Sequence, residues 1–276
     1  MNLQASTAEL YLPFEKFPVK TGNNQITKKA GSLRKNIILS ERDYEVLAFI
    51  LDMKFASVQE VYEKFFKNFD LDGNEFGFFY AKKRLVHLEQ CGFLKSTKEF
   101  FNSKRLFFGT MRSYFILSNF YPDKILVRPQ GSIDGRTLFH DFLLLGLRLK
   151  LESSKKITSW LSDRKLRCFP ELAGGLTGGY VPDGIYTMPD GTNIAFELEI
   201  ALKGKDKYRE KIRKYICLLK SSSNVKPFSK VHFVYAKDIV GSHLTRETKL
   251  YPELFTIESL ANYQTSQTNL NLTRKG

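Results

Sequence analysis

The sequence lacks the features that mark membrane proteins, disulfide-rich secreted proteins and zinc-cluster proteins. Its 276 residues include three cysteines, odd in number and far apart, so neither a disulfide framework nor a zinc cluster is predicted. The longest apolar helix candidate, residues 139–151, is too short to span a bilayer and contains two basic residues. The N-terminus does not have the charged-then-apolar order of a signal peptide. We therefore expect a soluble, cytoplasmic protein.

Acidic residues are scarce relative to basic ones. The chain has 43 Lys and Arg against 29 Asp and Glu, a net charge of +14, of which residues 121–276 carry about +9. Such an excess favours a polyanionic partner, most often nucleic acid, although charge alone does not separate DNA from RNA or from an acidic membrane surface. The 42% of hydrophobic residues are enough to form cores in a chain long enough for two domains.

The first half of the chain predicts three helices followed by a hairpin. Ser40 and Ser57 have the capping pattern of helix starts, and a third helix is expected from about Glu75 to Gln90. Two short strands follow, near residues 93–97 and 105–110. This order is typical of a winged helix-turn-helix domain.

The third predicted helix has two different faces. Its apolar face comprises Phe78, Ala81, Leu85 and Leu88, and its opposite face comprises Tyr80, Lys83, Arg84 and His87. An aromatic and basic face suits phosphates and base edges in a major groove. The alternative is a solvated face of a small helical domain that binds protein, but the recognition position of this helix favours DNA contact.

The most informative segment lies between residues 179 and 219, where two predicted strands precede a basic helix. The second strand alternates between an apolar face and a face that carries Glu197 and Glu199. A Pro189-Asp190-Gly191 loop closes the hairpin. If the loop is centred on Asp190, then Asp183 lies opposite Glu197.

Opposed carboxylates repel each other, and a hard cation such as Mg²⁺ between them removes that repulsion. Asp183 and Glu197 are therefore candidate metal ligands. The alternative is that these carboxylates form an ordinary solvated strand face, because a shift of one residue in register would separate the pair.

The basic helix, expected over about 206–220, is amphipathic. Lys207, Lys211 and Lys214 line one flank, and residues 205–220 hold seven basic side chains against two acidic ones. This excess predicts binding along a phosphate backbone with a steep salt dependence. The alternative is a solvated charged face.

The rest of the second half predicts an α/β domain. It begins with an apolar helix over 136–152, in which His140 is expected to be a hydrogen-bonded core histidine. One bent strand over 157–161 and 164–168, the hairpin, the basic helix and a strand near 230–236 give an α-β-β-β-α-β order, and a last strand follows near 254–258.

These residues together resemble a known fold. Val181-Pro182-Asp183-Gly184, then Glu197-x-Glu199, then a lysine-rich helix, resembles the PD-(D/E)XK nuclease-like fold. Within that fold, residues 36–260 are similar to the replication-relaxation family of mobile-element proteins, which join a winged helix to such a domain. The other matching pieces are His140 in its helix, Trp160-x-x-Asp163-Arg164, and Lys211-x-x-x-Tyr215.

The resemblance implies that Asp183 and Glu197 hold Mg²⁺. It places Glu199 where nuclease members carry a lysine, so Lys203 or Lys207 would have to supply the cation that orients water. The implied catalytic set is Asp183, Glu197, Glu199, Lys203 and Lys207. The same departure is what a chain that has lost cleavage activity would show.

These patterns predict a factor that binds double-stranded DNA. The resemblance implies that it belongs to a plasmid or other mobile element, with a relaxase or other mobile-element protein as a candidate partner. Its DNA contacts would be Tyr80, Lys83, Arg84, His87, Lys207, Lys211 and Lys214. The alternatives are an active Mg²⁺-dependent endonuclease and a transcriptional regulator whose C-terminal domain dimerises. The expected parts are a flexible basic arm (1–35), a winged helix domain (36–118), a linker (119–135), a nuclease-like α/β domain (136–262) and a polar tail (263–276).

Overall fold

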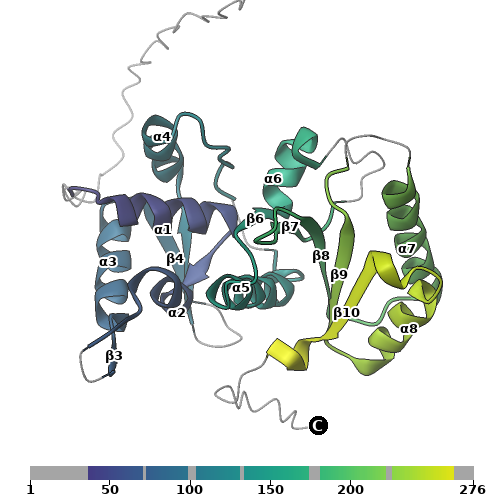
Figure 1. The fold of residues 1–276 in the computed structure, drawn as a ribbon. Coiled ribbons are helices and arrows are strands. Elements are labelled where there is room, and N and C mark those ends of the chain that lie inside the picture. The colour runs from purple at the N-terminus through teal and green to yellow at the C-terminus, as the bar shows by residue number, and fades with distance from the viewer. Residues whose placement is uncertain are drawn as a thin grey trace, which may run out of the picture. The chain divides into compact units, whose positions relative to one another are not determined.

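The computed structural model describes residues 37–70, 73–98, 104–130, 134–173, 181–221 and 226–263. These residues form a mixed α/β structure in which N-terminal helices with small antiparallel sheets precede a five-stranded mixed sheet with helices (Figure 1). The expected basic arm and residues 264–276 of the expected tail lie outside the described residues.

The N-terminal part is built from helices and short antiparallel strands. Its helices are α1 (Glu41–Asp52), α2 (Val58–Val61), which continues into a π-helical turn (Tyr62–Phe66), α3 (Phe78–Gln90) and α4 (Met111–Phe120). Its strands are β1 (Ala56–Ser57), β2 (Asn68–Phe69), β3 (Glu75–Phe76), β4 (Leu94–Lys98) and β5 (Arg105–Gly109). One sheet has the order β1-β5-β4, and β2 pairs with β3 in another.

The predicted helix caps are confirmed. The Ser40 and Ser57 side chains accept hydrogen bonds from the first turns of α1 and α2, and Asp43 and Glu60 complete the two capping boxes. Each reciprocal pair satisfies two backbone N–H groups that the helix start leaves without an internal partner.

Helix α3 begins at Phe78, three residues later than predicted. Glu75 and Phe76 form β3, and Gly77 adopts a φ of 114° before the first turn. A Cβ at Gly77 would lie 2.0 Å from the carbonyl oxygen of Phe66, so the chain passes here at a distance that only glycine permits. This close approach fixes the β2–β3 hairpin against the start of α3.

Helix α4 is absent from the sequence-based prediction, which ended the domain at residue 118 and began the linker at 119. The Tyr44 ring of α1 stacks on Phe120 with 3.7 Å between centroids, and Leu117 is fully buried. These are tertiary contacts, which local sequence patterns do not reveal. The segment without helix or strand therefore begins at residue 121.

The second half is organised around one sheet of order β10-β9-β8-β7-β6. Its strands are β6 (Ser159–Ser162), β7 (Gly184–Thr187), β8 (Asn193–Glu199), β9 (Lys230–Tyr235) and β10 (Phe255–Ser259). Strand β7 is antiparallel to β6 and β8, whereas β8, β9 and β10 are parallel. Its helices are α5 (Leu138–Ser153), α6 (Asp163–Cys168), α7 (Lys205–Lys220) and α8 (Asp238–Thr248).

Helices cover both faces of this sheet (Figure 1). On one face, Phe196 and Leu198 join a core with the leucines of α5 and the buried residues of α1 and α3. On the other, Ala195 and Phe233 pack with α7 and α8. The alternation predicted for β8 is confirmed in its apolar half. The opposite half faces α7 instead of solvent.

Two predictions for this half need correction. Residues Arg164–Cys168 form helix α6 and not the second part of a bent strand, because the Ser162 side chain accepts a hydrogen bond from the backbone of Lys165 and caps a helix start. Helix α8 was not predicted at all, and Gly241 in its middle is a poor helix former. The predicted order α-β-β-β-α-β is otherwise found in α5, β6, β7, β8, α7 and β9.

Among the described residues, no helix combines the length and apolar character needed to cross a membrane.

Candidate functional site

The predicted site residues fall in two places. Asp183, Glu197 and Glu199 lie where β7 begins and β8 ends, next to α7, and Tyr80, Lys83, Arg84 and His87 lie on α3. We describe the first group as the carboxylate cluster and the second as the α3 face.

The register of the β7–β8 hairpin is the predicted one. Gly184 pairs with Phe196 and Ile185 with Ala195, so the same register continued by one residue sets Asp183 opposite Glu197. The Met188 N–H donates to the carbonyl oxygen of Thr192 and closes the three-residue loop. Placement of the two carboxylates thus follows from loop length and strand alternation alone.

The glycine that follows Asp183 has a steric role. A Cβ at Gly184 would lie 2.4 Å from the indole ring of Trp160, which is buried on β6, where it pairs with Tyr186. A side chain here would therefore displace the tryptophan or separate β6 from β7. The close approach of β6 to β7 beside Asp183 therefore explains the glycine at position 184.

Glu197 and Glu199 are buried, with 3% and 1% of their surface exposed. The Lys211 ammonium lies between them, 2.8 Å from Glu197 Oε2 and 2.6 Å from Glu199 Oε1. Tyr215 donates its hydroxyl hydrogen bond to Glu197, and Lys203 lies 2.6 Å from Glu199 Oε2. The alternative of a solvated strand face is therefore wrong for Glu197 and Glu199. Both are buried, and both have the charged or hydrogen-bonding partners that a buried carboxylate requires.

Asp183 has a more open environment, with 24% of its side chain exposed. Its Oδ2 accepts a hydrogen bond from the Leu198 N–H at 2.8 Å and lies 3.2 Å from Nε2 of His140. Burial opposes ionisation of Asp183, but the hydrogen bond and charge of His140 outweigh it and lower the pKa of the carboxyl group.

His140 links the carboxylate cluster to α5. Burial disfavours its charged form, yet the hydrogen bonds to Asp141 and Asp183 raise the pKa of the imidazole to about 10. It is therefore an imidazolium at neutral pH, shared between two carboxylates. His140 is hydrogen-bonded as predicted, but its side chain is only partly buried, with 22% exposed, and one of its partners, Asp183, is a predicted site residue.

Two further residues belong to the same network. Lys54, which follows α1 in a left-handed conformation (φ 74°), places its ammonium 2.9 Å from Asp141 and 3.6 Å from Asp163. Burial raises the pKa of Asp163. Lys54 was missed because no sequence pattern ties a residue that follows the first helix to acidic residues of α5 and α6, far along the chain.

The negative charge of the carboxylate cluster is already compensated by cationic side chains of the protein itself. Burial and the neighbouring Asp183 raise the pKa of Glu197 to about 6, although Lys211 opposes this shift. Within the described ranges, no group of three or more His, Cys, Asp or Glu side chains has the arrangement needed to hold a metal ion. The donor chemistry of Asp183 and Glu197, hard carboxylate oxygens, is nonetheless that of a Mg²⁺ site.

The predicted lysines of α7 and the preceding loop separate into two groups. Lys211 is turned inward, with 12% of its side chain exposed. Lys207 and Lys214 are exposed, and Lys214 pairs with Glu210 one turn earlier. Of the two lysines predicted to reach the carboxylates, Lys203 does so, whereas no contact of Lys207 with them is found among the described residues.

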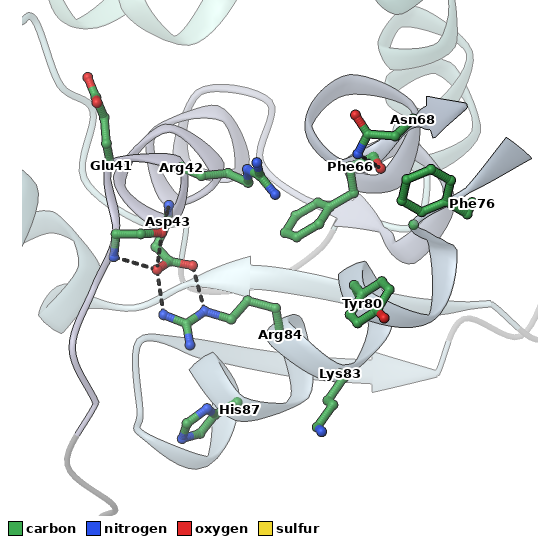
Figure 2. A pocket seen from close by; sticks show the side chains of 12 residues that line it. Glu41, Arg42, Asp43, Phe66, Asn68, Phe76, Tyr80, Lys83, Arg84 and His87 are labelled. Atoms are coloured by element: carbon green, nitrogen blue, oxygen red, sulfur yellow. Dashed lines mark hydrogen bonds and ion pairs between the residues drawn. The ribbon is translucent and has the colours of Figure 1, made fainter. Parts of the chain in front are cut away.

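The α3 face combines exposed and paired side chains (Figure 2). Tyr80 is 63% exposed and Lys83 is exposed, while Ala81, Leu85 and Leu88 on the opposite side are buried. The predicted division of the helix into two faces is confirmed at these positions, but Phe78, which was predicted on the apolar face, is 44% exposed. His87 is partly exposed on the same side as Tyr80 and Lys83.

Arg84 differs from its neighbours on this face. Its Nε donates to Oδ1 of Asp43 at 2.7 Å, and its guanidinium also contacts Oδ2 of Asp43 (Figure 2). The guanidinium donates a further hydrogen bond to the carbonyl oxygen of Ile38. Burial opposes ionisation of Asp43, which is 1% exposed, but Arg84 and Ser40 outweigh it and lower the pKa of that carboxyl group. Arg84 thus holds α3 to the start of α1.

Comparisons of this chain with known protein families, with curated protein sequences and with solved structures give no match.

Proposed function

We propose that this protein is a DNA-binding factor of a plasmid or other mobile element, in which a winged helix docks on duplex DNA and a nuclease-like domain holds the adjoining backbone. The observation that carries the proposal is the α3 face. Helix α3 is anchored by a buried apolar side and presents exposed Tyr80 and Lys83 on the other. A helix of this kind supplies phosphate and base-edge contacts in a major groove.

The order of elements supports the assignment of the N-terminal part to the winged helix class. Three helical segments, α1, α2 and α3, are followed by the antiparallel β4–β5 hairpin, and β1 joins that hairpin in a three-stranded sheet. In winged helices the third helix is the recognition helix, so Tyr80, Lys83 and His87 would face the duplex. Arg84, held by Asp43, would position α3 and need not touch DNA.

The second half supports the nuclease-like assignment through its topology and its carboxylates. The order α5-β6-α6-β7-β8-α7-β9, in which α6 is an addition to the predicted order, and the opposition of Asp183 to Glu197 support the resemblance described above. The exposed Lys207 and Lys214 of α7 would hold phosphates beside the winged helix. A relaxase or another mobile-element protein is the partner that this class of function implies.

A second candidate function, Mg²⁺-dependent DNA cleavage, is favoured by one observation. Lys211 bridges Glu197 and Glu199, so a lysine does stand at the carboxylates although position 199 is a glutamate. Asp183 and Glu197 would hold the ion, Lys203 and Lys211 would orient water, and Lys207 would contact phosphate. The bound Mg²⁺ would supply charge stabilisation at the phosphate and lower the pKa of water.

We favour binding without cleavage because the protein's own cations already neutralise the cluster. Lys211 and Tyr215 engage both oxygens of Glu197, and His140 engages Asp183. A divalent ion between Asp183 and Glu197 would have to displace or repel these groups. Mg²⁺ binding is therefore expected to be weak, and the cluster serves mainly to hold α7 against the sheet.

The test of the proposed function measures binding of a fluorescently labelled duplex in solution. The unaltered protein should bind, and Lys83→Ala should weaken binding several-fold. Lys249→Ala, which removes an exposed lysine after α8, is the matched control and should have a smaller effect. Absence of duplex binding, or equal loss in the two variants, contradicts the proposal.

The endonuclease alternative has a separate test. A bound ion raises the thermal midpoint of the free protein, because a ligand bound only by the folded state stabilises it. The thermal midpoint and the nicking of supercoiled plasmid are measured with Mg²⁺ for the unaltered protein and for Asp183→Asn. Nicking that the substitution abolishes would establish the enzyme, and a metal-dependent midpoint without nicking would establish a binding site alone.

A further inference from the structure

An open hollow of about 690 Å³ lies beside α3. Its walls come from three separate segments: the start of α1, the turn and hairpin around Phe66 and Phe76, and the α3 face with Tyr80 and Lys83 (Figure 2). The hollow is therefore a product of the tertiary fold and not a groove along one helix.

The hollow is bordered by exposed aromatic rings. Phe76 is 46% exposed and Tyr80 is 63% exposed, and both line the hollow. Phe69, Phe78 and Phe79 on the same hairpin and helix start are exposed as well, although they lie outside the lining of the hollow. A soluble protein rarely gathers so many exposed rings in one place unless that surface binds something.

The backbone that carries these rings is held firmly. Tyr62 donates a hydrogen bond to Glu75, and Lys67 pairs with Glu75 at 2.8 Å, so β3 is tied to the preceding helical turn. The close approach of Gly77 to Phe66 fixes the same junction. A rigid platform loses little conformational entropy when a ligand stacks on it.

The charges around the rings favour an anionic ligand. Arg42 lies 5.0 Å above the Phe66 ring, and Lys83 borders the hollow on the α3 side. Of the two lining acids, Asp43 is paired with Arg84, and the Glu41 side chain points away from Tyr80 (Figure 2). Flat rings flanked by cations suit a nucleotide, which joins an aromatic base to a phosphate.

We propose that this hollow receives an unpaired base of DNA, which stacks on Phe76 and Tyr80 while Arg42 and Lys83 hold the flanking phosphates. The inference rests on the proposed function and adds a substrate class to it: duplex DNA that adjoins an unpaired stretch. A perfect duplex keeps its bases stacked inside the helix, so the rings of the hollow contribute only where a base is free to leave the stack.

The test compares the affinity of three DNAs of the same sequence at one salt concentration: a perfect duplex, the same duplex with a short unpaired loop, and the single strand. The unaltered protein should prefer the looped duplex over the perfect one by roughly tenfold, as expected when one or two bases stack on aromatic rings. A fluorescent adenine analogue placed in the loop should lose emission on binding, because stacking quenches it.

Phe76→Ala is the decisive variant. It should abolish the preference and the quenching, and Phe76→Trp should retain both, because a larger ring still stacks. The matched control is Phe115→Ala on α4, where a 59% exposed ring lies outside the lining of the hollow. It should leave the preference intact. Thermal midpoints verify that each variant is folded.

The outcomes distinguish the inference from the proposed function. Equal affinity for the looped and perfect duplexes, or a preference that survives in Phe76→Ala, overturns the inference and leaves duplex binding standing. Absence of binding to all three DNAs overturns both.

Discussion

Helices α3 and α7 both have a basic face, but the structure uses the two sets of charges differently. On α3, Tyr80 and Lys83 point to solvent from a buried apolar base. On α7, the central lysine of the basic flank, Lys211, turns inward to two buried glutamates, and Lys207 and Lys214 remain outside. Similar helical periodicities therefore do not imply similar roles.

The comparison shows how to separate cations that hold a fold together from those that contact a partner. A buried carboxylate is costly without a charged or hydrogen-bonding partner, so Lys211 and Arg84 are required by Glu197 and Asp43 respectively. An exposed lysine such as Lys83 makes little difference to stability. Its effect is expected in binding.

The largest expected effect comes from Lys211→Met, which keeps the length of the side chain and removes its charge. Glu197 and Glu199 would remain buried without their shared ammonium, so the free energy of unfolding should fall by about 3–5 kcal/mol. Chemical denaturation measures this difference.

Lys207→Met on the same helix is the control and should change the unfolding free energy by less than about 0.5 kcal/mol. If the two substitutions had equal and small effects, Lys211 would not be the partner that stabilises the buried glutamates, and the distinction between α7 and α3 would fail.

A smaller loss is expected from Arg84→Ala. The substitution leaves Asp43 buried with only the hydrogen bonds of Ser40, so the free energy of unfolding should fall by about 2–3 kcal/mol. Lys83→Ala, one residue earlier, should stay within about 0.5 kcal/mol. A stability of Arg84→Ala equal to that of Lys83→Ala in denaturant melts would show that Arg84 is not needed at Asp43.

The pH dependence of the free energy of unfolding should report the raised pKa of His140. Its pKa is raised from 6.5 to about 10, so the folded state holds this proton more tightly than the unfolded state does. The stabilisation is fully present below pH 6.5 and is lost as the pH rises through about 10. The free energy of unfolding should therefore decrease between pH 7 and 9.5, by up to about 1.4 kcal/mol per pH unit.

His140→Gln removes the titrating group and should flatten this profile relative to the unaltered protein. Other groups that titrate above pH 9 affect both proteins alike, so the difference between the two curves isolates His140. Parallel curves would mean that the imidazolium between Asp141 and Asp183 is not formed.

Local patterns predicted the parts of this fold that depend on local chemistry. The caps at Ser40 and Ser57, the two faces of α3 and the β7–β8 register were all predicted from residue spacing, because capping, helical periodicity and loop length act over a few residues. The position of Asp183 opposite Glu197 follows from the β7–β8 register.

The remainder depends on contacts between distant segments. Helix α4 packs through the stacking of Phe120 on Tyr44, and Lys54 reaches Asp141 and Asp163 from the end of α1. The inward orientation of Lys211 could likewise not be predicted from the sequence, because a lysine next to a buried stripe of a helix can equally well point to solvent. The pairing of β8 with β9 and the packing of α7 on the sheet determine that the Lys211 side chain points to the glutamates.

The most direct test of the account is the salt dependence of duplex binding by the unaltered protein. If the α3 face and the outer lysines of α7 contact several phosphates, the logarithm of the binding constant should fall linearly with the logarithm of salt concentration, with a slope of roughly −3 or steeper. Lys83→Ala should reduce the magnitude of that slope by about one. A binding constant that does not change between low and physiological salt would contradict the claim that these exposed cations bind DNA.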